Sequence, residues 1–361
     1  MLRAILIDVV HYTVSRAEAE VRLAELSELT RTYGGLVVVE VFQRRAAPDQ
    51  NTYIGSGKVE TLFETWPTHR AEVLIINGFL KPGVMDRLQE KFKPLKMEVW
   101  DRYDLILNIF EKHATTVEAK LQIELAKIRH LGPRMVGMSE QLGRQRGGTG
   151  TRGGAGEGNT EVMKRHWKEQ ERRIATKLEQ LEQGRNLQRQ NRRRQEIVTV
   201  ALVGYTNAGK TSVLNKLTKK KELSANRLFA TLDTRLGEWF IEGSPKKILI
   251  SDTIGFIQDL PPALIKAFKS TLSEAIQADL LLLVIDGADH RLIEKLAVVE
   301  AILASLVPTN QPRLLLYNKS DLPNFTILAD RPGIGFSTIT GIGTDTLEQQ
   351  VRALLFPSAR L

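Results

Sequence analysis

The stretch of sequence that decides the fold is Gly204-Tyr205-Thr206-Asn207-Ala208-Gly209-Lys210-Thr211. It follows an apolar, β-branched run, Ile197 to Val203, which is typical of a buried strand. The residues behind it, Ser212 to Leu217, favour a helix. A glycine loop between a strand and a helix predicts a phosphate-binding loop, because its backbone N–H groups and the helix N-terminus converge on an anion. In such a loop we expect Lys210 to reach the outer phosphates and the Thr211 hydroxyl to bind Mg²⁺.

Composition restricts the class of protein. The chain has 361 residues, enough for two or three domains, and it has no cysteine, which excludes disulfides, thiolate metal sites and cysteine catalysis. This fits a reducing compartment, and we expect a cytoplasmic protein that does not form oligomers. The segment from Met1 to Asp8 has an apolar run too short for a signal peptide, and we expect no membrane-spanning segment. The net charge of +9 suggests a polyanionic partner.

Residues 1–110 alternate between strand and helix patterns, which predicts a small parallel α/β domain. Within this domain, Gly55-Ser56-Gly57-Lys58 could be a second phosphate site, but it lacks the full loop spacing, so a tight turn before a helix is the favoured interpretation. The expected strands are Ala4–Val10, Leu36–Phe42, Val73–Ile76 and Met97–Trp100, and the expected helices are Ala17–Thr32, Lys58–Trp66 and Gly83–Phe92.

Residues 111–196 predict an antiparallel helical hairpin. One helix covers Thr116 to Leu131 and is expected to end at Gly132-Pro133, and a second covers about Thr160 to Gln195. Between them, residues 143–158 are rich in glycine and arginine and are expected to form a mobile loop. Arginine on such a loop, and a basic face on the second helix, favour contact with nucleic-acid phosphate, although a plain linker and a solvated helix face stay open. The candidate RNA-binding residues are Arg144, Arg146, Arg152, Arg192, Arg193 and Arg194.

Residues 197–361 carry four further signals in a fixed order. Phe229-Ala230-Thr231-Leu232-Asp233 offers Thr231 as a second magnesium ligand, and Asp252-Thr253-Ile254-Gly255 follows a strand so that its carboxylate can hold Mg²⁺. Asn318-Lys319-Ser320-Asp321 also follows a strand, and an aspartate there can accept hydrogen bonds from the N1–H and the amine of guanine. Ser337 and Thr338 are expected near the guanine carbonyl. Together these signals predict a guanine-nucleotide-binding domain with a mostly parallel sheet.

These assignments define a candidate site for GTP hydrolysis. Lys210 and Gly255 are the candidate catalytic residues, and Thr211, Thr231 and Asp252 are the candidate magnesium ligands. Many small GTPases place a glutamine directly after this glycine to orient the attacking water, but here the position is Phe256. We therefore expect slow intrinsic hydrolysis that a partner accelerates. The residues expected to bind GTP are Gly204, Tyr205, Thr206, Asn207, Ala208, Gly209, Lys210, Thr211, Ser212, Phe229, Ala230, Thr231, Leu232, Asp233, Asp252, Thr253, Ile254, Gly255, Asn318, Lys319, Ser320, Asp321, Ser337 and Thr338.

Several segments also resemble the HflX family of translation-factor-related GTPases. The likeness covers nearly the whole chain and rests on Phe229–Asp233, Asp252–Ile257, Tyr53–Val59, Asp101–Phe110 and Glu118–Ala126. It implies an N-terminal α/β domain, a helical hairpin with a glycine-rich loop, and a GTPase domain. It also implies that the protein binds the large ribosomal subunit and ribosomal RNA and splits or rescues ribosomes. The family's loop usually continues as Gly-Glu-Thr-Gln-Leu-Glu, whereas this chain has Gly156-Glu157-Gly158-Asn159-Thr160-Glu161.

Three functions therefore remain in competition. The leading prediction is a magnesium-dependent, ribosome-associated GTPase that acts on the large subunit. The second is a GTP-binding regulator of a protein partner, without RNA contact. The third adds an ATP-dependent activity at Gly55-Ser56-Gly57-Lys58, for which the sequence offers little support.

Overall fold

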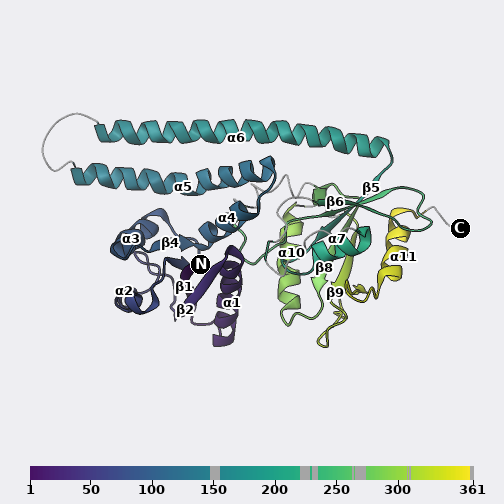
Figure 1. Ribbon diagram of the computed structural model, residues 1–361, viewed down its shortest axis with the longest axis horizontal. Coiled ribbons are helices and arrows are strands. Elements are labelled where there is room, and N and C mark those ends of the chain that lie inside the picture. Colours follow the sequence, from purple (N-terminus) through teal and green to yellow (C-terminus); the bar gives the residue numbers. More distant parts are fainter. Residues whose placement is uncertain are drawn as a thin grey trace. The chain divides into compact units, whose positions relative to one another are not determined.

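The computed structural model describes residues 1–146, 155–219, 228–229, 235–261, 264, 274–306, 308 and 310–357, apart from the side chains of residues 66–67 and 133–160. The chain divides into two compact units (Figure 1). The first comprises Met1–Lys112 and Lys120–Leu178, and the second comprises His113–Ala119 and Glu179–Leu361. The helical hairpin contributes to both units. The three-domain division predicted from the sequence remains a prediction.

The first unit is built on a four-stranded sheet in the order β2-β1-β3-β4, with every neighbouring pair parallel. The predicted small parallel α/β domain is therefore confirmed. Buried aliphatic side chains from the sheet pack against its helices, because crossover helices cover the faces of a parallel sheet. The strands are β1 (Leu2–Val10), β2 (Gly35–Arg44), β3 (Val73–Ile76) and β4 (Glu98–Asp101), and the helices are α1 (Arg16–Tyr33), α2 (Ser56–His69), α3 (Pro82–Phe92), the 3-10 turn η1 (Lys93–Leu95) and α4 (Arg102–His113).

Of the second glycine pair, Gly55 directly precedes α2 and Gly57 lies in the first turn of that helix. The Gly55 N–H donates to Gln43 Oε1 at 2.8 Å, and a Cβ atom built on Gly55 would lie 2.6 Å from Arg45 Nη1. Tyr53, at the start of the turn, has a φ of 65°. The Gly55 N–H is thus bonded to a side chain of β2, and the turn is a local feature of the chain before a helix.

The helical hairpin consists of α5 (Val117–Arg146) and α6 (Ala155–Arg194), which run side by side (Figure 1). The predicted stop at Gly132-Pro133 is wrong, because α5 continues through it. A Cβ atom built on Gly132 would lie 2.8 Å from Trp167 Cε3, so the glycine allows α6 to pack closely against α5. The predicted loop was also too long: residues 143–146 and 155–158 are helical, and the segment between them lies outside the described residues.

The second unit contains a six-stranded sheet in the order β10-β9-β8-β5-β7-β6. Only β6 runs antiparallel to its neighbour β7, which confirms the prediction of a mostly parallel sheet. Described strands are β5 (Val198–Val203), β6 (Arg235–Trp239), β7 (Ile248–Asp252), β8 (Leu280–Asp286), β9 (Arg313–Asn318) and β10 (Ile334–Gly335). Described helices are α7 (Lys210–Thr218), α10 (Leu292–Leu306) and α11 (Thr344–Leu355). None of the helices in the described ranges is both long and apolar enough to cross a membrane.

Candidate functional site

The phosphate-loop sequence occupies the turn between β5 and α7, at the carboxyl edge of the sheet. Its two outer glycines are required by close approaches. A Cβ atom on Gly204 would lie 2.2 Å from Val284 O, and one on Gly209 would lie 2.2 Å from Asn318 Nδ2. Gly209 also has a φ of 94°, which favours glycine. The Asn318 amide donates to Ala208 O at 2.9 Å, so the loop is bonded to the end of β9.

Lys210 is the first residue of α7 and is buried. Its ammonium group donates to Gly204 O at 3.2 Å and to Tyr205 O at 3.0 Å, which folds the side chain back over the loop. Burial lowers the pKa of Lys210 to about 8, and the nearby Asp252 carboxylate opposes this shift only in part. The site therefore holds a desolvated cation beside the backbone N–H groups of the loop, which is an arrangement suited to binding phosphate oxygens.

The two described magnesium candidates lie together. The Thr211 hydroxyl donates to Asp252 Oδ2 at 2.7 Å, although the two residues come from α7 and from the end of β7. Hydroxyl and carboxylate oxygens are the ligands that Mg²⁺ prefers, so the donor set fits this ion. The third candidate, Thr231, lies outside the described residues, as do Ala230, Leu232 and Asp233.

The segment after Asp252 is bonded to the phosphate loop through its backbone. Thr206 N–H donates to Phe256 O at 2.8 Å, and Phe256 N–H donates to Gly204 O at 3.1 Å. A Cβ atom on Gly255 would lie 2.8 Å from Lys210 Nζ and 2.9 Å from Thr206 Cα, so the backbone of the phosphate loop leaves room only for glycine here. The Phe256 side chain is fully buried.

The predicted guanine corner is assembled from β9 and the turn after β10. The buried Ser337 hydroxyl donates to Asp321 Oδ1 at 2.6 Å, and the Ser320 N–H donates to Phe336 O at 3.0 Å. Lys319 forms an ion pair with Asp286 at 2.5 Å. The sequence analysis did not identify Asp286, although its position at the end of the neighbouring strand β8 was the available signal.

The remaining candidates differ in their surroundings. Asn207 is exposed at the outside of the loop and has a φ of 64°, whereas Thr206, Ile254 and Thr253 are buried. The Thr253 hydroxyl donates to Leu202 O at 2.7 Å, which fixes the chain directly after the β7 strand. The half-buried candidates are Ser212, Ser320 and Thr338, and Phe229 is buried with a φ of 55°.

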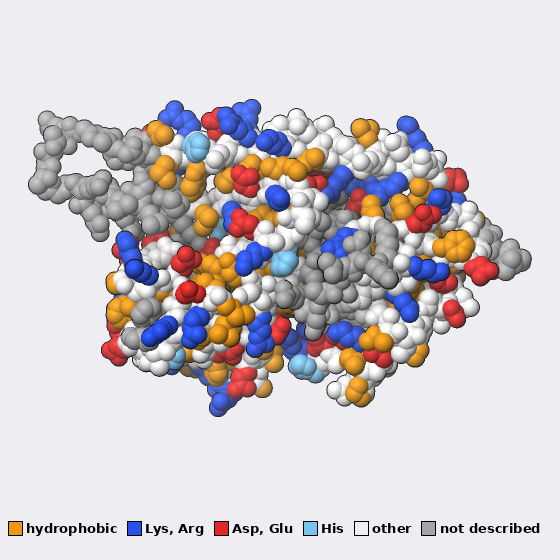
Figure 2. All heavy atoms as spheres, in the orientation of Figure 1, with side chains coloured by type: hydrophobic (Ala, Val, Ile, Leu, Met, Phe, Trp, Pro, Cys, Tyr) orange, Lys and Arg blue, Asp and Glu red, His pale blue; other side chains and the backbone are white. Residues whose placement is uncertain are grey.

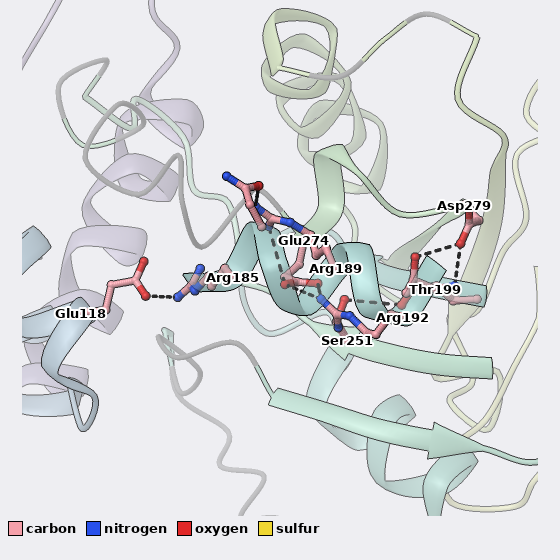
Figure 3. Close-up of polar contacts among 10 residues, drawn as sticks. Glu118, Arg185, Arg189, Arg192, Thr199, Ser251, Glu274 and Asp279 are labelled. Atoms are coloured by element: carbon pink, nitrogen blue, oxygen red, sulfur yellow. Dashed lines mark hydrogen bonds and ion pairs between the residues drawn. The ribbon is translucent and has the colours of Figure 1, made fainter. Parts of the chain in front are cut away.

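The arginines at the end of α6 do not all face outward. Arg192 Nη2 donates to both carboxylate oxygens of Glu274, at 3.1 and 3.2 Å, and Arg189 Nη1 lies 3.8 Å from the same carboxylate (Figure 3). Arg185 pairs with Glu118 in the same view. Arg193 and Arg194 are exposed. The side chains of Arg144, Arg146 and Arg152 lie outside the described part of the structure.

A separate group of possible metal ligands lies in the first unit. Asp101, Asp104 and His130 each place one ligand atom within 4.8 Å of the others. However, the Asp104 N–H donates to Asp101 Oδ1 at 2.9 Å, and the Asp101 N–H donates to Asp104 Oδ2 at 3.1 Å. These reciprocal bonds cap the start of α4 and account for the two carboxylates without a metal.

Comparison with known proteins agrees with this geometry. Three family models match consecutive parts of the chain: GTP-binding GTPase N-terminal over residues 20–111, GTP-binding GTPase Middle Region over 113–192, and 50S ribosome-binding GTPase over 199–319. GTPase HflX of Caldanaerobacter subterraneus subsp. tengcongensis is 40% identical over 98% of this chain and 81% of its own length. GTPase HflX of Escherichia coli K12 is 37% identical over 91% of this chain and 77% of its own.

Solved structures give the same result at the level of the fold. The crystal structure of SsGBP in complex with GDP aligns over 100% of both chains, with 25% identity and a TM-score of 0.54. A GTP-binding protein from the archaeon Sulfolobus solfataricus, also in complex with GDP, aligns over 99% of both chains, with 26% identity and a TM-score of 0.50.

Proposed function

Because the chain belongs to the HflX family of GTPases, and so binds GTP and hydrolyses it, we propose that it acts on the large ribosomal subunit and splits or rescues ribosomes. The family model that matches the GTPase sequence is described as a 50S ribosome-binding GTPase, which supports this partner. The proposal joins two parts of the chain: a nucleotide site in the second unit and a basic helix that contacts ribosomal RNA.

In the nucleotide site, the loop N–H groups and Lys210 bind the phosphates, and Asp321 binds the guanine edge. Thr211 and Asp252, whose oxygens lie 2.7 Å apart, would hold Mg²⁺ together with Thr231. The ion would supply positive charge against the negative charge that develops on the phosphates during hydrolysis. The Gly255 N–H responds to the γ-phosphate.

The exposed basic face of α6 is the observation that carries the RNA part of the proposal. Arg165, Lys168 and Arg172 are all exposed, and their spacing places them on one side of the helix. The opposite side packs against α5 through Trp167 and Ile174. Figure 2 shows Lys and Arg side chains gathered along this helix.

The basic residues of α6 differ in whether acidic side chains neutralise them, and this difference supports RNA contact by the exposed face. Near its end, Arg185, Arg189 and Arg192 are neutralised by Glu118 and Glu274 inside the second unit. Earlier in the helix, the described ion pairs are the solvent-exposed one between Arg173 and Glu169 and the one between Glu171 and Arg129 of α5, and neither includes Arg165, Lys168 or Arg172. Exposed, unneutralised cations suit polyphosphate, whereas the pairs near the end hold the protein together. We therefore assign RNA contact to this face together with Arg193 and Arg194, and to the predicted Arg144, Arg146 and Arg152.

Co-sedimentation with ribosomal subunits tests the proposal. The intact protein should pellet with large subunits in GTP, less in GDP and least without nucleotide. Reversing the exposed charges in the triple variant Arg165→Glu, Lys168→Glu, Arg172→Glu should reduce binding at least about tenfold and flatten its salt dependence. Arg16→Glu is the matched control, because Arg16 is 79% exposed in the first unit and lies on another helix.

The alternative function is a GTP-binding regulator of a protein partner. It predicts that the triple variant binds large subunits as the native protein does, or that neither binds them. Salt dependence separates the two functions, because contacts with RNA phosphates release counterions, whereas most contacts between proteins do so much less.

A further inference from the structure

Tyr205, the second residue of the phosphate loop, contacts the segment that follows Asp252 through its side chain. Its phenol oxygen accepts a hydrogen bond from the Gln258 N–H at 2.7 Å. The tyrosine is buried, with 6% of its surface exposed, so little water competes for this bond. Gln258 lies two residues beyond Phe256, the position at which many small GTPases carry their catalytic glutamine.

The backbone explains why a side chain is needed here. Tyr205 and Phe256 form an isolated parallel bridge, in which Phe256 N–H donates to Gly204 O and Thr206 N–H donates to Phe256 O. A continuing parallel ladder would next bond the Gln258 N–H to Thr206 O. The loop turns away at this point, since Ala208 N–H donates back to Tyr205 O at 3.3 Å and Asn207 has a φ of 64°. The Gln258 N–H donates to the Tyr205 phenol oxygen instead of to Thr206 O.

The tyrosine ring is held from its other side by α10. Lys295 Nζ lies 5.1 Å from the ring centroid, within the range of a cation–π contact. Lys295 is itself bonded to Asp289, just before α10. The ring therefore contacts Lys295 of α10, and its hydroxyl bonds the backbone of Gln258.

We propose that Tyr205 is a positioning residue for GTP hydrolysis, which holds residues 256–258 and thereby the Gly255 N–H in the geometry that the reaction requires. Gly255 directly precedes the anchored residues and lies against Lys210, where a Cβ atom would come within 2.8 Å of Nζ. Phe256 has no polar side-chain atom to orient water, so the placement of backbone groups contributes more of the catalysis here than in a GTPase with a glutamine.

The variant Tyr205→Phe removes the hydrogen-bond acceptor and keeps the ring. In the full-length protein without ribosomes, kcat for GTP should fall about three- to tenfold, while the affinity for GDP stays within about twofold. Exchange of the Gln258 amide hydrogen should become about tenfold faster or more, because that N–H loses its partner. The exchange rate reports the anchor directly, whatever the cause of the change in kcat.

Tyr317→Phe is the matched control. It also removes a tyrosine hydroxyl of the second unit, one that donates to Arg331 O at 2.7 Å, and it should change neither kcat nor the exchange of Gln258. The proposal is overturned if Tyr205→Phe leaves kcat or Gln258 exchange unchanged, if kcat rises, or if GDP affinity falls in parallel with kcat. Since no ribosome is present, none of these outcomes depends on the proposed action on the large subunit.

Discussion

Lys210 is buried, and we propose that its positive charge binds the nucleotide phosphates. Burial lowers the pKa of its ammonium group to about 8 in the free protein, and phosphate binding favours the charged form. Below that pH the lysine is already charged, so binding needs no extra proton. Above it the free amine is neutral, and binding must take up a proton, which weakens the measured affinity.

Nucleotide affinity should therefore fall as the pH rises, by about threefold between pH 7.5 and pH 8.5. Isothermal titration calorimetry with GDP, in buffers of different ionisation enthalpy, measures both the affinity and the proton uptake. Lys210→Arg is the control, because a guanidinium stays charged throughout this range, so any binding that it retains should not depend on pH. An equally flat profile for the native protein would remove Lys210 from this role. Lys210→Ala should abolish binding or hydrolysis.

Asp321 is the residue to which we assign the preference for guanine. Its carboxylate is held by the Ser337 hydroxyl at 2.6 Å and can accept hydrogen bonds from guanine N1–H and the amine. Asp321→Asn replaces one acceptor by a donor, so the preference for GTP over ATP should fall at least about tenfold. Competition binding with GTP and ATP measures this preference. Asp330→Asn, a change at another exposed aspartate, is the control. Unchanged selectivity would mean that Asp321 does not read the base.

Gly132 allows α5 and α6 to approach closely at one point. A Cβ atom on Gly132 would lie 2.8 Å from the Trp167 ring, whereas one on Gly184 in α6 would meet no atom within 4 Å. Gly132→Ala should destabilise the hairpin by about 1–3 kcal/mol through overpacking. Gly184→Ala should stabilise its helix by about 0.5–1 kcal/mol. Thermal denaturation, followed by circular dichroism of the helices, tests both variants. A shift of the melting temperature in the same direction for Gly132→Ala and Gly184→Ala would contradict the proposed packing.

The end of α6 is bonded to the rest of the second unit by a partly buried cluster of two arginines and one glutamate. The side chains of Arg189, Arg192 and Glu274 are 9%, 15% and 11% exposed, and burial lowers the pKa of Arg189. Glu274→Ala leaves both partly buried guanidinium groups without this carboxylate, at a cost of about 1–3 kcal/mol. Glu169→Ala, which breaks the exposed pair with Arg173, should cost no more than about 1 kcal/mol. The exchange rates of the β5 and β8 backbone amides measure how much each variant destabilises the second unit. Equal destabilisation by Glu274→Ala and Glu169→Ala would contradict this prediction.

The elements could be predicted from the sequence where the signal is local. The phosphate loop, its flanking strand and helix, and the parallel sheet of the first unit follow from glycine spacing and hydrophobic periodicity. Three features could not be predicted, because each depends on a distant partner. Gly132-Pro133 reads locally as a helix stop, but Trp167 makes the glycine a packing site. Arg192 belongs to a basic run, but its guanidinium group is paired with the carboxylate of Glu274, which is distant in the sequence. Tyr205 looks like a variable loop position until Gln258 is placed beside it.

The whole molecule combines a GTP site that has Phe256 in place of a glutamine with a helix that has an exposed basic face. Phe256 is buried and cannot orient water, so the protein alone should hydrolyse GTP slowly. A partner that binds the basic face and orders the nucleotide site would then set the rate. The proposed partner is the large ribosomal subunit.

The most direct test of this claim is the GTP turnover of the full-length protein, measured alone, with purified large subunits and with purified small subunits. We predict slow turnover alone, a rise of about tenfold or more with large subunits, and little change with small subunits, as in other GTPases whose partners complete the site. The triple variant Arg165→Glu, Lys168→Glu, Arg172→Glu should keep the slow rate and lose most of the rise. The same turnover with and without large subunits would contradict the account.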